Sequence, residues 1–407
     1  MSNKDKEDDR ELSQTQQVFI IGSKGIPAKY GGFETFVEKL LEYQVSNKIS
    51  YHVACIGSEH KHYKYLKGRC FDVKVPNIGP AKAIYYDLAA LRYSIGYCKH
   101  HTAIKRPIFY ILACRIGPFI GYYKKKIEKL GGLLYVNPDG HEWKRTKWSM
   151  PVRKYWKMSE RQMVKSADLL ICDSQNIERY IRQEYWYYKP RTIYIAYGAT
   201  LKCAQLANDD EQFTTWLKCN DLAIKDYFLV VCRLVPENNF KTIIQNFMNS
   251  KTTKALVMIT NENGTFSRYL NSELSIKEDQ RIKFVGTVFD QELLKKIREC
   301  AYGYLHGHEV GGTNPTLLEA LSSTNLNLLL QVGFNQEVAQ DSALYFNKRQ
   351  GNLARLIDKV DVMPESERLE WGVKAKARIA KRYSWEFIVS EYEKLFLSMR
   401  MADSEEF

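Results

Sequence analysis

The stretch from His306 to Leu321, HGHEVGGTNPTLLEAL, decides the fold, because its pattern is typical of a strand end, a glycine turn and a helix. Asn314 is a good N-cap, since its side-chain oxygen can accept a hydrogen bond from an otherwise unpaired amide. Pro315 suits the first helical position, where no amide donor is needed. Gly311 and Gly312 let the backbone approach a ligand without an intervening Cβ.

A helix that begins in this way favours an anion, because its first amides and the positive end of its dipole face the same point. We expect the backbone at Gly312 and Thr313 to contribute such amides. Glu319 lies further into the helix, where its carboxylate can accept hydroxyl groups of a ribose. The pattern therefore predicts a ligand that contains a phosphate and a sugar. If no other part of the chain supported such a ligand, an ordinary connection between a strand and a helix capped by Asn314 and Pro315 would explain the pattern as well.

The length of 407 residues favours two domains, because a single core rarely grows to that size. The longest apolar stretch, Ile108–Tyr123, is too short and too interrupted to span a bilayer. No signal peptide opens the chain, and its nine cysteines lack the spacing of metal ligands. We therefore expect a cytoplasmic protein with reduced thiols, no metal site and no cofactor.

The positive charge is confined to the first half of the chain. Residues 17–200 hold 31 lysines and arginines against 14 aspartates and glutamates, a net charge of +17, whereas residues 201–407 carry −2. A basic half can meet nucleic acid, an anionic membrane surface or a phosphorylated substrate. A solvated basic face without any such partner is the alternative.

Apolar, β-rich runs alternate with helical patterns along the chain. This alternation predicts an α/β fold with two doubly wound, Rossmann-like domains, a cleft between them, and ligands beyond the carboxyl ends of the strands. We expect a disordered leader over residues 1–16, a first domain over 17–206 and a second over 207–383. A closing helix over 384–407 can pack back on the first domain.

A glycine-rich loop follows the first expected strand, over residues 22–36. It lacks the Gly-x-Gly-x-x-Gly spacing, so the dinucleotide fingerprint of a dehydrogenase is absent. Gly31 and Gly32, directly ahead of a helix, can still present amides to a diphosphate. A purely structural glycine turn explains this loop equally well on its own.

A second polar loop, NPDGHEWKR over residues 137–145, also follows an expected strand. Asp139 or Glu142 can act as a base toward an acceptor hydroxyl, and His141 can donate a hydrogen bond to a sugar or a phosphate. Lys144 and Arg145 add two cations, which together with the glycine loop suit an acceptor diphosphate.

Two further residues follow strands in the same way. Asp173 comes after the expected strand Leu169–Cys172, where it either adds a catalytic carboxylate or caps the next helix. Arg233 comes after the first strand of the second domain, where its planar guanidinium suits phosphate oxygens.

Four stretches of the chain also resemble one protein family. GSKGIPAKYGGFETFVEKL at residues 22–40, NPDGHEWKR at 137–145, CRLVPENN at 232–239 and HGHEVGGTNPTLLEAL at 306–321 are similar to a bacterial rhamnosyltransferase group of glycosyltransferase family 4. The resemblance is strongest to the β-1,4-rhamnosyltransferases of streptococcal-type capsule and cell-wall polysaccharide assembly. The stretches occur in order over nearly the whole chain, so the resemblance is specific.

The resemblance implies a GT-B fold and a retaining, metal-independent transferase. It implies dTDP-β-L-rhamnose as the donor, and a glucose or N-acetylglucosamine on undecaprenyl diphosphate as the acceptor of a β-1,4 linkage. It also implies a peripheral position on the inner face of the cell membrane. No nucleic-acid partner is expected on this basis.

The resemblance assigns donor binding to the second domain. Glu319 matches the second glutamate of the family's Glu-x7-Glu motif, which holds the ribose, but Gly311 stands at the position of the first and Glu309 lies two residues away. Arg233 matches the phosphate-binding arginine, whereas Asn238 replaces the lysine that usually follows it. The expected donor-binding residues are Arg233, Asn238, Glu309, Gly311, Gly312, Thr313, Asn314 and Glu319.

Two stretches of the basic half mix cations with aromatic side chains, Lys124–Lys126 with its neighbours and Lys147–Lys157. We expect them to contact anionic lipid, near which each basic residue contributes about 1 kcal/mol. A solvated basic face over an aromatic core stripe is the alternative. Two other functions stay open: a family 4 transferase with a UDP-hexose donor, and a basic nucleic-acid-binding protein.

Overall fold

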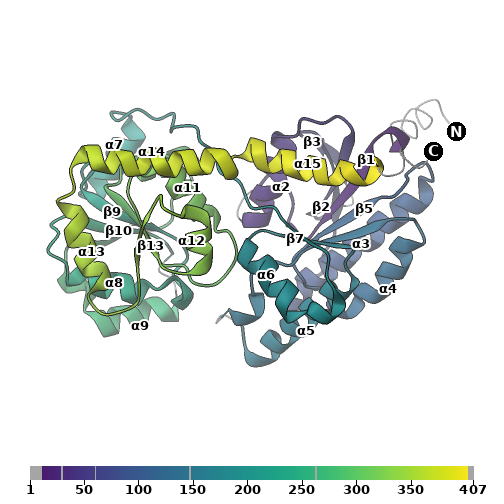
Figure 1. Ribbon diagram of the computed structural model, residues 1–407, viewed down its shortest axis with the longest axis horizontal. Coiled ribbons are helices and arrows are strands. Elements are labelled where there is room, and N and C mark those ends of the chain that lie inside the picture. Colours follow the sequence, from purple (N-terminus) through teal and green to yellow (C-terminus); the bar gives the residue numbers. More distant parts are fainter. Residues whose placement is uncertain (1–11, 29–30, 60, 146–147, 262–263, 402–407) are drawn as a thin grey trace. The chain divides into compact units, whose positions relative to one another are not determined.

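Two α/β units make up the chain, each built around one largely parallel sheet (Figure 1). The computed structural model describes residues 12–28, 31–59, 61–145, 148–261 and 264–401. The first unit runs to Tyr197 and resumes at Trp385, and the second comprises Gly198–Ser384. The boundary between the units therefore lies after Tyr197 rather than after residue 206.

The sheet of the first unit has eight strands in the order β3-β4-β2-β1-β5-β6-β7-β8, and only the β3–β4 pair is antiparallel. Its central strand β1 is buried along its whole length, as expected for a parallel sheet that is covered on both faces. The strands are β1 Gln16–Ile21, β2 Ile49–Ile56, β3 His62–Tyr65, β4 Gly68–Val73, β5 Ile108–Leu112, β6 Leu133–Asn137, β7 Leu169–Cys172 and β8 Thr192–Tyr194.

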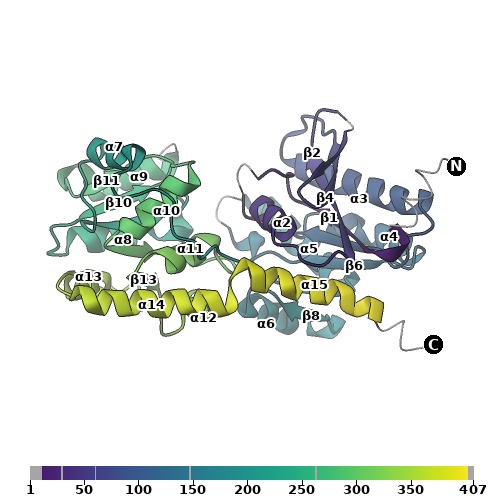
Figure 2. The ribbon, with the colours of Figure 1, turned by 90° about the horizontal axis from the view of Figure 1, so that it is seen from above.

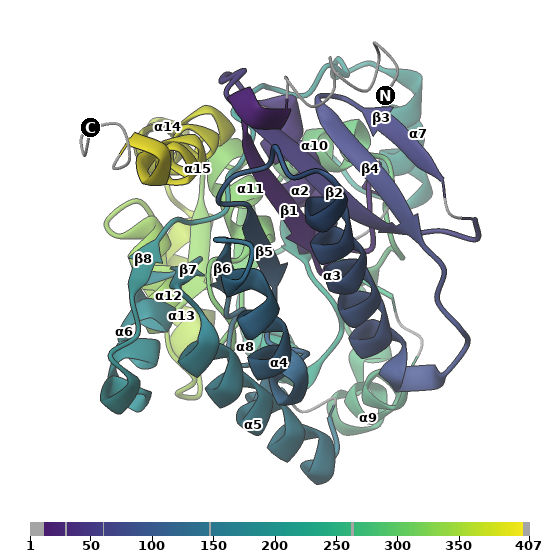
Figure 3. The ribbon, with the colours of Figure 1, turned by 90° about the vertical axis from the view of Figure 1, so that its right-hand side faces the viewer.

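Helices cover both faces of this sheet (Figure 3). Side chains alternate between the faces of a strand, so Phe19 and Ile21 enter the core shared with α3, α4, α5 and α6. The other face packs against α2 and α15. The helices are α2 Gly32–Glu42, α3 Lys82–His100, α4 Gly117–Glu128, α5 Met150–Ser166, α6 Gln175–Glu184 and α15 Trp385–Met401.

Helix α15 runs beside α2, over β1 and β2 (Figures 1 and 2). Tyr392 is buried there, with its hydroxyl 3.1 Å from that of Tyr110 and its ring centroid 5.1 Å from that of Phe36. The Glu393 carboxylate accepts a hydrogen bond of 2.8 Å from the Val45 amide. Aromatic contacts and an ionic hydrogen bond therefore fasten the end of the chain to the first unit.

The leader expected over residues 1–16 needs a correction at its end. Leu12 is buried in the same core as Phe19, and Gln16 begins β1 by pairing with Ile49. Residues 12–16 thus belong to the folded unit, because the Leu12 side chain and the beginning of β1 are buried there. Residues 1–11 lie outside the described part of the chain.

The sheet of the second unit has six strands, all parallel, in the order β11-β10-β9-β12-β13-β14. Its strands are β9 Tyr227–Val231, β10 Ala255–Ile259, β11 Ile282–Phe284, β12 Gly303–His306, β13 Asn327–Leu330 and β14 Leu344–Phe346. Its helices are α7 Glu211–Cys219, α8 Phe240–Met248, α9 Thr265–Leu274, α10 Gln291–Cys300, α11 Pro315–Ser323, α12 Gly333–Ala339, α13 Asn352–Asp361 and α14 Glu365–Arg382.

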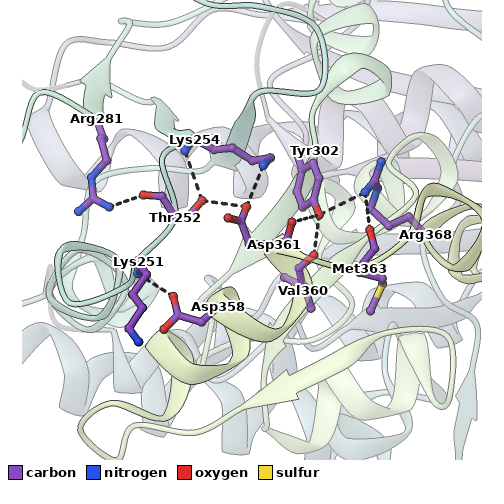
Figure 4. A network of polar contacts seen from close by, with 10 residues as sticks. All are labelled: Lys251, Thr252, Lys254, Arg281, Tyr302, Asp358, Val360, Asp361, Met363 and Arg368. Atoms are coloured by element: carbon purple, nitrogen blue, oxygen red, sulfur yellow. Dashed lines mark hydrogen bonds and ion pairs between the residues drawn. The ribbon is translucent and has the colours of Figure 1, made fainter.

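The amino ends of these strands are closed by a polar network (Figure 4). Asp361 accepts hydrogen bonds from the Thr252 hydroxyl at 2.9 Å and from the Lys254 ammonium at 2.8 Å. The Tyr302 ring lies 4.5 Å from the Lys254 ammonium and 4.5 Å from the Arg368 guanidinium carbon. These contacts fasten α13 and α14 to the sheet. A ligand site is therefore expected at the opposite edge, because ligands of open α/β sheets bind beyond the carboxyl ends of the strands.

Candidate functional site

The amino terminus of α11 lies beyond the carboxyl end of β12. The Asn314 side chain accepts hydrogen bonds from the Thr316 amide at 2.9 Å and the Thr316 hydroxyl at 2.7 Å, which confirms the predicted N-cap. Pro315 holds the first helical position. Gly311 has a φ of +137°, and a Cβ there would meet no atom within 4 Å. The turn therefore borders open space at Gly311, as an anion-binding terminus requires.

Arg233 lies beyond β9, the strand that pairs with β12. Its side chain is exposed, and no carboxylate within the described ranges forms an ion pair with it. Asn238, by contrast, is 1% exposed and donates a hydrogen bond of 2.6 Å to the Arg233 carbonyl. Asn238 therefore stabilises the loop that carries Arg233 from its buried side, while the guanidinium faces solvent.

Asn239 connects this loop to the turn before α11. Its side-chain amide donates to the Gly307 carbonyl at 2.8 Å and to Glu309 Oε2 at 2.6 Å. Lys348 forms an ion pair with the same Glu309 oxygen. Glu309 thus has two protein partners, and it anchors the turn as well as standing near the expected first glutamate of the motif.

Glu319 projects from α11 with 38% of its side chain exposed. Its Oε2 accepts a hydrogen bond of 2.6 Å from Nη2 of Arg298, a residue of α10 that is 3% exposed. Thr313, between the glycines and the cap, is 4% exposed. The structure therefore brings the expected donor residues together at one edge of the second sheet, and adds Arg298 to them.

Two histidines extend from the same strand end. His306 is buried, and burial lowers its pKa to about 3, so its imidazole is neutral at pH 7. Its ring stacks on that of His308, with the centroids 4.9 Å apart. In the part of the chain that the structure describes, no group of three or more His, Cys, Asp or Glu side chains is placed to hold a metal ion.

In the first unit, the glycine loop after β1 is held by the helix that follows it. Glu34 Oε1 accepts a hydrogen bond of 2.7 Å from the Lys24 amide. Gly31 has a φ of +131°, and a Cβ there would lie 1.9 Å from Glu34 Oε2, so only glycine fits. A Cβ on Gly32 would meet no atom within 4 Å. Gly31 is therefore required by the turn, while Gly32 borders open space.

A buried ion pair lies beneath this loop and was not predicted from the sequence. Arg115 Nη1 donates to the Gly22 carbonyl at 3.0 Å and to Asp87 Oδ2 at 3.2 Å. Asp87 is fully buried, and burial raises its pKa to about 6 against the opposing effect of Arg115. In the sequence, the only sign of this ion pair is that Arg115 lies three residues after the apolar strand β5. That position does not indicate Asp87 as its partner.

Arg115 also lies close to the loop over residues 137–145, called the histidine loop after His141. Burial alone would lower the pKa of Arg115, but the carboxylates of Asp87, Asp139 and Glu142 raise it above its ordinary value. The side chain is 19% exposed, so part of the guanidinium reaches solvent. Arg115 therefore supplies a fixed positive charge beside two of the predicted catalytic carboxylates.

The histidine loop follows β6 and turns sharply. Asp139 and His141 have φ values of +59° and +51°, in the left-handed region that non-glycine residues seldom occupy outside turns and functional sites. The Asp139 amide donates to the Asn137 side chain at 2.8 Å, and the Gly140 amide donates to Asp139 Oδ1 at 2.8 Å. These bonds hold the Asp139 carboxylate in a half-buried position at the sheet edge.

Of the remaining charged residues of this loop, Glu142 and Arg145 pair with each other and Lys144 does not. Glu142 accepts a hydrogen bond of 2.9 Å from the Trp148 indole and lies 2.5 Å from Arg145 Nε. Lys144 is exposed, with its ammonium 5.2 Å from the Trp143 ring centroid. Glu142 and Arg145 thus brace the loop, whereas Lys144 is directed to solvent.

Helices α5 and α6 position His141 from the side. The imidazole lies 4.2 Å from the Tyr180 ring, between centroids. Lys157 donates to the Tyr180 hydroxyl at 2.6 Å, and its ammonium lies 4.7 Å from the Trp143 ring centroid. Buried Glu160 in turn accepts a hydrogen bond from the Tyr180 hydroxyl. This arrangement fixes the loop to α5, which contacts it directly.

Asp173 lies beyond β7 and is 4% exposed. The alternative that it caps the next helix is wrong, because the N-cap of α6 is Ser174, whose hydroxyl accepts from the Asn176 amide at 3.1 Å. Asp173 therefore stays at the carboxyl edge with Asp139, but it is far less accessible.

Comparison with known proteins identifies the fold. A family model described as "Domain of unknown function (DUF1972)" matches residues 15–200, and no curated protein matches the chain. Sucrose-phosphate synthase from Thermosynechococcus elongatus superposes with a TM-score of 0.74 at 16% identity, over 95% of this chain and 100% of that one. An α,α-trehalose 6-phosphate synthase from Burkholderia multivorans gives 0.71 at 12% identity, over 97% and 98%.

A glycosyltransferase from Rickettsia africae ESF-5 gives a TM-score of 0.69 at 11% identity, over 94% of this chain and 98% of that one. At these identities the likeness concerns the fold alone. The chain therefore has the GT-B fold, with two domains that each contain a parallel sheet, as predicted.

The environment of His141 predicts an unusual titration. Burial, together with the positive charges of Lys144 and Lys157, lowers its pKa to about 4. In a histidine-resolved NMR titration, the His141 signal should shift with a midpoint near pH 4 instead of about 6.5. Because the unfolded chain takes up the proton first, this histidine should also weaken the fold as the pH falls from about 6.5 toward 4.

Lys157→Met should raise the His141 midpoint, since it removes one of the two cations. Lys165→Met, an exposed lysine on the same helix, should leave it unchanged. A wild-type midpoint near 6.5 would contradict the described packing of His141.

Proposed function

We propose that the protein is a retaining glycosyltransferase that moves L-rhamnose from dTDP-β-L-rhamnose to a glucose or N-acetylglucosamine on undecaprenyl diphosphate. The product would be a β-1,4 linkage in capsule or cell-wall polysaccharide. The observation that carries the proposal is the capped, open amino terminus of α11, with exposed Arg233 at the same sheet edge and Glu319 further along the helix. The family resemblance of the sequence supplies the identities of donor and acceptor.

Two solved neighbours support a nucleotide-sugar donor and an anionic acceptor. One, from E. coli, is bound with UDP-2-fluoro glucose, and another, from Burkholderia xenovorans, is in complex with glucose-6-phosphate. The GT-B fold also favours a transferase over the nucleic-acid-binding alternative, which leaves the α11 terminus without a role.

The donor diphosphate fits the amide groups that precede α11. Glu319 lies four residues after Pro315, which places it roughly 6 Å further along the helix axis. That spacing suits a nucleotide whose phosphates face the helix terminus and whose sugar hydroxyls reach the carboxylate. Arg233 then neutralises the phosphates from the neighbouring strand end, because a guanidinium binds two phosphate oxygens at once.

The reaction breaks the bond between C1 of rhamnose and the dTDP oxygen, and forms a bond from C1 to O4 of the acceptor sugar. A β donor and a β product have the same configuration, so the reaction proceeds with retention. The electron pair of the broken bond stays on the diphosphate, where the α11 amides and Arg233 stabilise the developing charge. The donor is positioned by these same groups, which is a second source of acceleration.

Asp139 is the best placed of the three candidate carboxylates to accept the proton of the acceptor hydroxyl. Glu142 is paired with Arg145, and Asp173 is 4% exposed, whereas Asp139 is half-buried at the sheet edge. His141, neutral at pH 7, can donate a hydrogen bond to the acceptor sugar. Arg115, Lys144 and the open backbone at Gly32 provide positive groups for the lipid diphosphate.

Helix α4 provides a surface for anionic lipid. Phe119 and Tyr122 are 46% and 61% exposed, and the Lys126 ammonium lies 4.2 Å from the Tyr122 ring centroid. Lys125 is also exposed. Lys124 contributes less than the sequence suggests, because Asp168 binds it at 2.5 Å. Of the second basic stretch, Lys147 lies outside the described residues.

No helix in the described ranges is long and apolar enough to cross a bilayer. We propose that the protein docks on the inner face of the cell membrane through α4, on the basis of the exposed aromatic and basic side chains of this helix.

Transfer should be visible as release of the nucleotide. With dTDP-L-rhamnose and a synthetic glucosyl- or N-acetylglucosaminyl-diphosphate lipid, the enzyme should release dTDP only when an acceptor is present, and also with a metal chelator. Asp139→Asn should lower kcat by roughly 10²–10⁴-fold, as expected for loss of a general base, with little change in the donor KM. Glu319→Ala should mainly raise the donor KM.

Glu59→Gln, an exposed carboxylate of the first unit, serves as the control and should keep full activity. Release from UDP-glucose or UDP-N-acetylglucosamine alone would replace the donor and keep the transferase. No release from any pair would contradict a glycosyltransferase.

Vesicle flotation tests the membrane surface. The protein should float with vesicles that contain about one third phosphatidylglycerol and stay at the bottom with neutral vesicles. Lys125→Glu with Lys126→Glu should weaken binding at least tenfold, because each lysine near an anionic surface contributes about 1 kcal/mol. The same reversal at Lys251, an exposed lysine of the second unit, should have little effect. Equal flotation of all variants would contradict docking through α4.

A further inference from the structure

A group of aromatic side chains is buried on the face of the first sheet that α2 and α15 cover (Figures 1 and 2). The Phe36 ring of α2 has its centroid 5.7 Å from that of Tyr197 and 6.4 Å from that of Tyr110. Tyr392 of α15 lies 5.1 Å from Phe36 and 6.0 Å from Tyr110, again between centroids. All four side chains are at most 8% exposed. Three hydroxyl groups are therefore buried there, and buried hydroxyls require polar partners.

These hydroxyls lie near the carboxyl end of β6. The Tyr110 and Tyr392 oxygens are 3.1 Å apart. Tyr110 pairs with Tyr135 across the sheet, and Asn137 is two residues beyond Tyr135, so Tyr110 and Asn137 face the same side. Burial raises the pKa of both Tyr110 and Tyr197, and a polar contact with the Asn137 side chain opposes that rise in each case. The tyrosine hydroxyls therefore reach the side-chain amide of Asn137.

Asn137 connects this group to Asp139 of the histidine loop. Its Oδ1 accepts a hydrogen bond of 2.8 Å from the Asp139 amide, and Asn137 itself is 1% exposed. Its Nδ2 is buried and forms no hydrogen bond of ordinary geometry with the residues that the structure describes. Because the Asp139 amide is a donor, it must face Oδ1, which leaves Nδ2 for the tyrosine hydroxyls. The contacts at both ends of the amide thus fix its orientation.

The conformation of Asp139 makes this connection important. Its φ of +59° is in the left-handed region, where a residue with a side chain stays only if surrounding contacts hold it. The bond from its amide to Asn137 is one such contact, and the bond from the Gly140 amide to Asp139 Oδ1 at 2.8 Å is another. The orientation of Asn137 therefore contributes directly to the position of the Asp139 carboxylate.

We propose that Tyr392, Tyr110 and Asn137 form a buried network that positions the Asp139 carboxylate for the acceptor hydroxyl. The inference rests on the function proposed above, in which Asp139 accepts the proton. The three network residues are positioning residues and not catalytic ones, because each is at most 1% exposed and acts through Asp139. Helix α15, at the far end of the sequence, thereby supports the acceptor site.

The consequence for catalysis follows from the geometry of proton transfer. Without the Tyr110 hydroxyl, the Asn137 amide loses a polar neighbour and can rotate, so its bond to the Asp139 amide weakens. A base accepts a proton only within hydrogen-bond reach, and misplacement for part of the time lowers kcat. The donor residues belong to the second unit, so the donor KM should not change.

Steady-state dTDP release tests this effect. Tyr110→Phe should lower kcat about three- to tenfold, the equivalent of one hydrogen bond, with an unchanged donor KM. Tyr392→Phe should have the same or a smaller effect, and the two changes together should cost no more than Tyr110→Phe alone. In an Asp139→Asn background, Tyr110→Phe should change kcat less than about twofold, because the carboxylate that it positions is absent.

Tyr51→Phe is the matched control. Tyr51 is also fully buried, and its ring centroid lies 6.1 Å from that of Phe396 of α15. Its hydroxyl has no hydrogen-bond partner within the described ranges, so it does not belong to the network. This variant should keep the wild-type kcat. An equal loss in Tyr51→Phe and Tyr110→Phe would mean that the tyrosines act only through packing. That result would overturn the inference, as would the full loss from Tyr110→Phe in the Asp139→Asn background.

Hydrogen–deuterium exchange without any substrate separates this inference from the proposed function. The amides of Asp139 and Gly140 should exchange faster in Tyr110→Phe than in the wild type and in Tyr51→Phe, while amides of β12 should not change. If the wild type releases no nucleotide from any donor and acceptor pair, the proposed function fails, and exchange alone decides whether the network holds the loop. Unchanged exchange of these two amides in Tyr110→Phe would overturn the network.

Discussion

In both sheets the strands run parallel, apart from β3, so every strand but β3 has its carboxyl end at the same edge of its sheet. The loops that carry Arg233, Gly311 and Glu319's helix are therefore gathered at one edge of the second unit, and those that carry Gly31 and Asp139 at one edge of the first. Helices at the amino edge of the second sheet are fastened by the Asp361 network. The residues proposed to bind ligands therefore lie at the carboxyl edge of each sheet.

The second unit offers an anion fixed partial charges rather than a full cage of cations. The α11 terminus supplies amides, Arg233 supplies one exposed cation, and Asn238 stands where a lysine would add a second. A helix terminus contributes about 0.3–1 kcal/mol toward an exposed anion, less than a charged hydrogen bond at about 1.5–3 kcal/mol. Arg233 is therefore expected to contribute more binding energy than the terminus, which mainly orients the diphosphate.

The structural features that could be predicted from the sequence are those encoded by neighbouring residues. Asn314 and Pro315 predict the start of α11 because a cap is a local pattern. The alternation of runs predicts two doubly wound α/β domains because it repeats over the chain, and the family resemblance adds that these form a GT-B fold. The Arg298–Glu319 and Asp87–Arg115 pairs join residues 21 and 28 positions apart, and no local pattern marks them. The N-cap of α6 is Ser174 and not Asp173. Capping propensity does not distinguish these neighbouring residues, because serine and aspartate are both favoured N-caps.

The proposed function depends on the binding of a nucleotide diphosphate at the start of α11, which hydrogen–deuterium exchange with and without dTDP can detect segment by segment. The backbone amides in residues 311–319 and in the 232–239 loop should exchange more slowly when dTDP is present. Exchange at the amino edge of the second sheet, around Thr252 and Asp361, should not change. Protection confined to other segments, or no protection at a saturating concentration of dTDP, would contradict nucleotide binding at the start of α11.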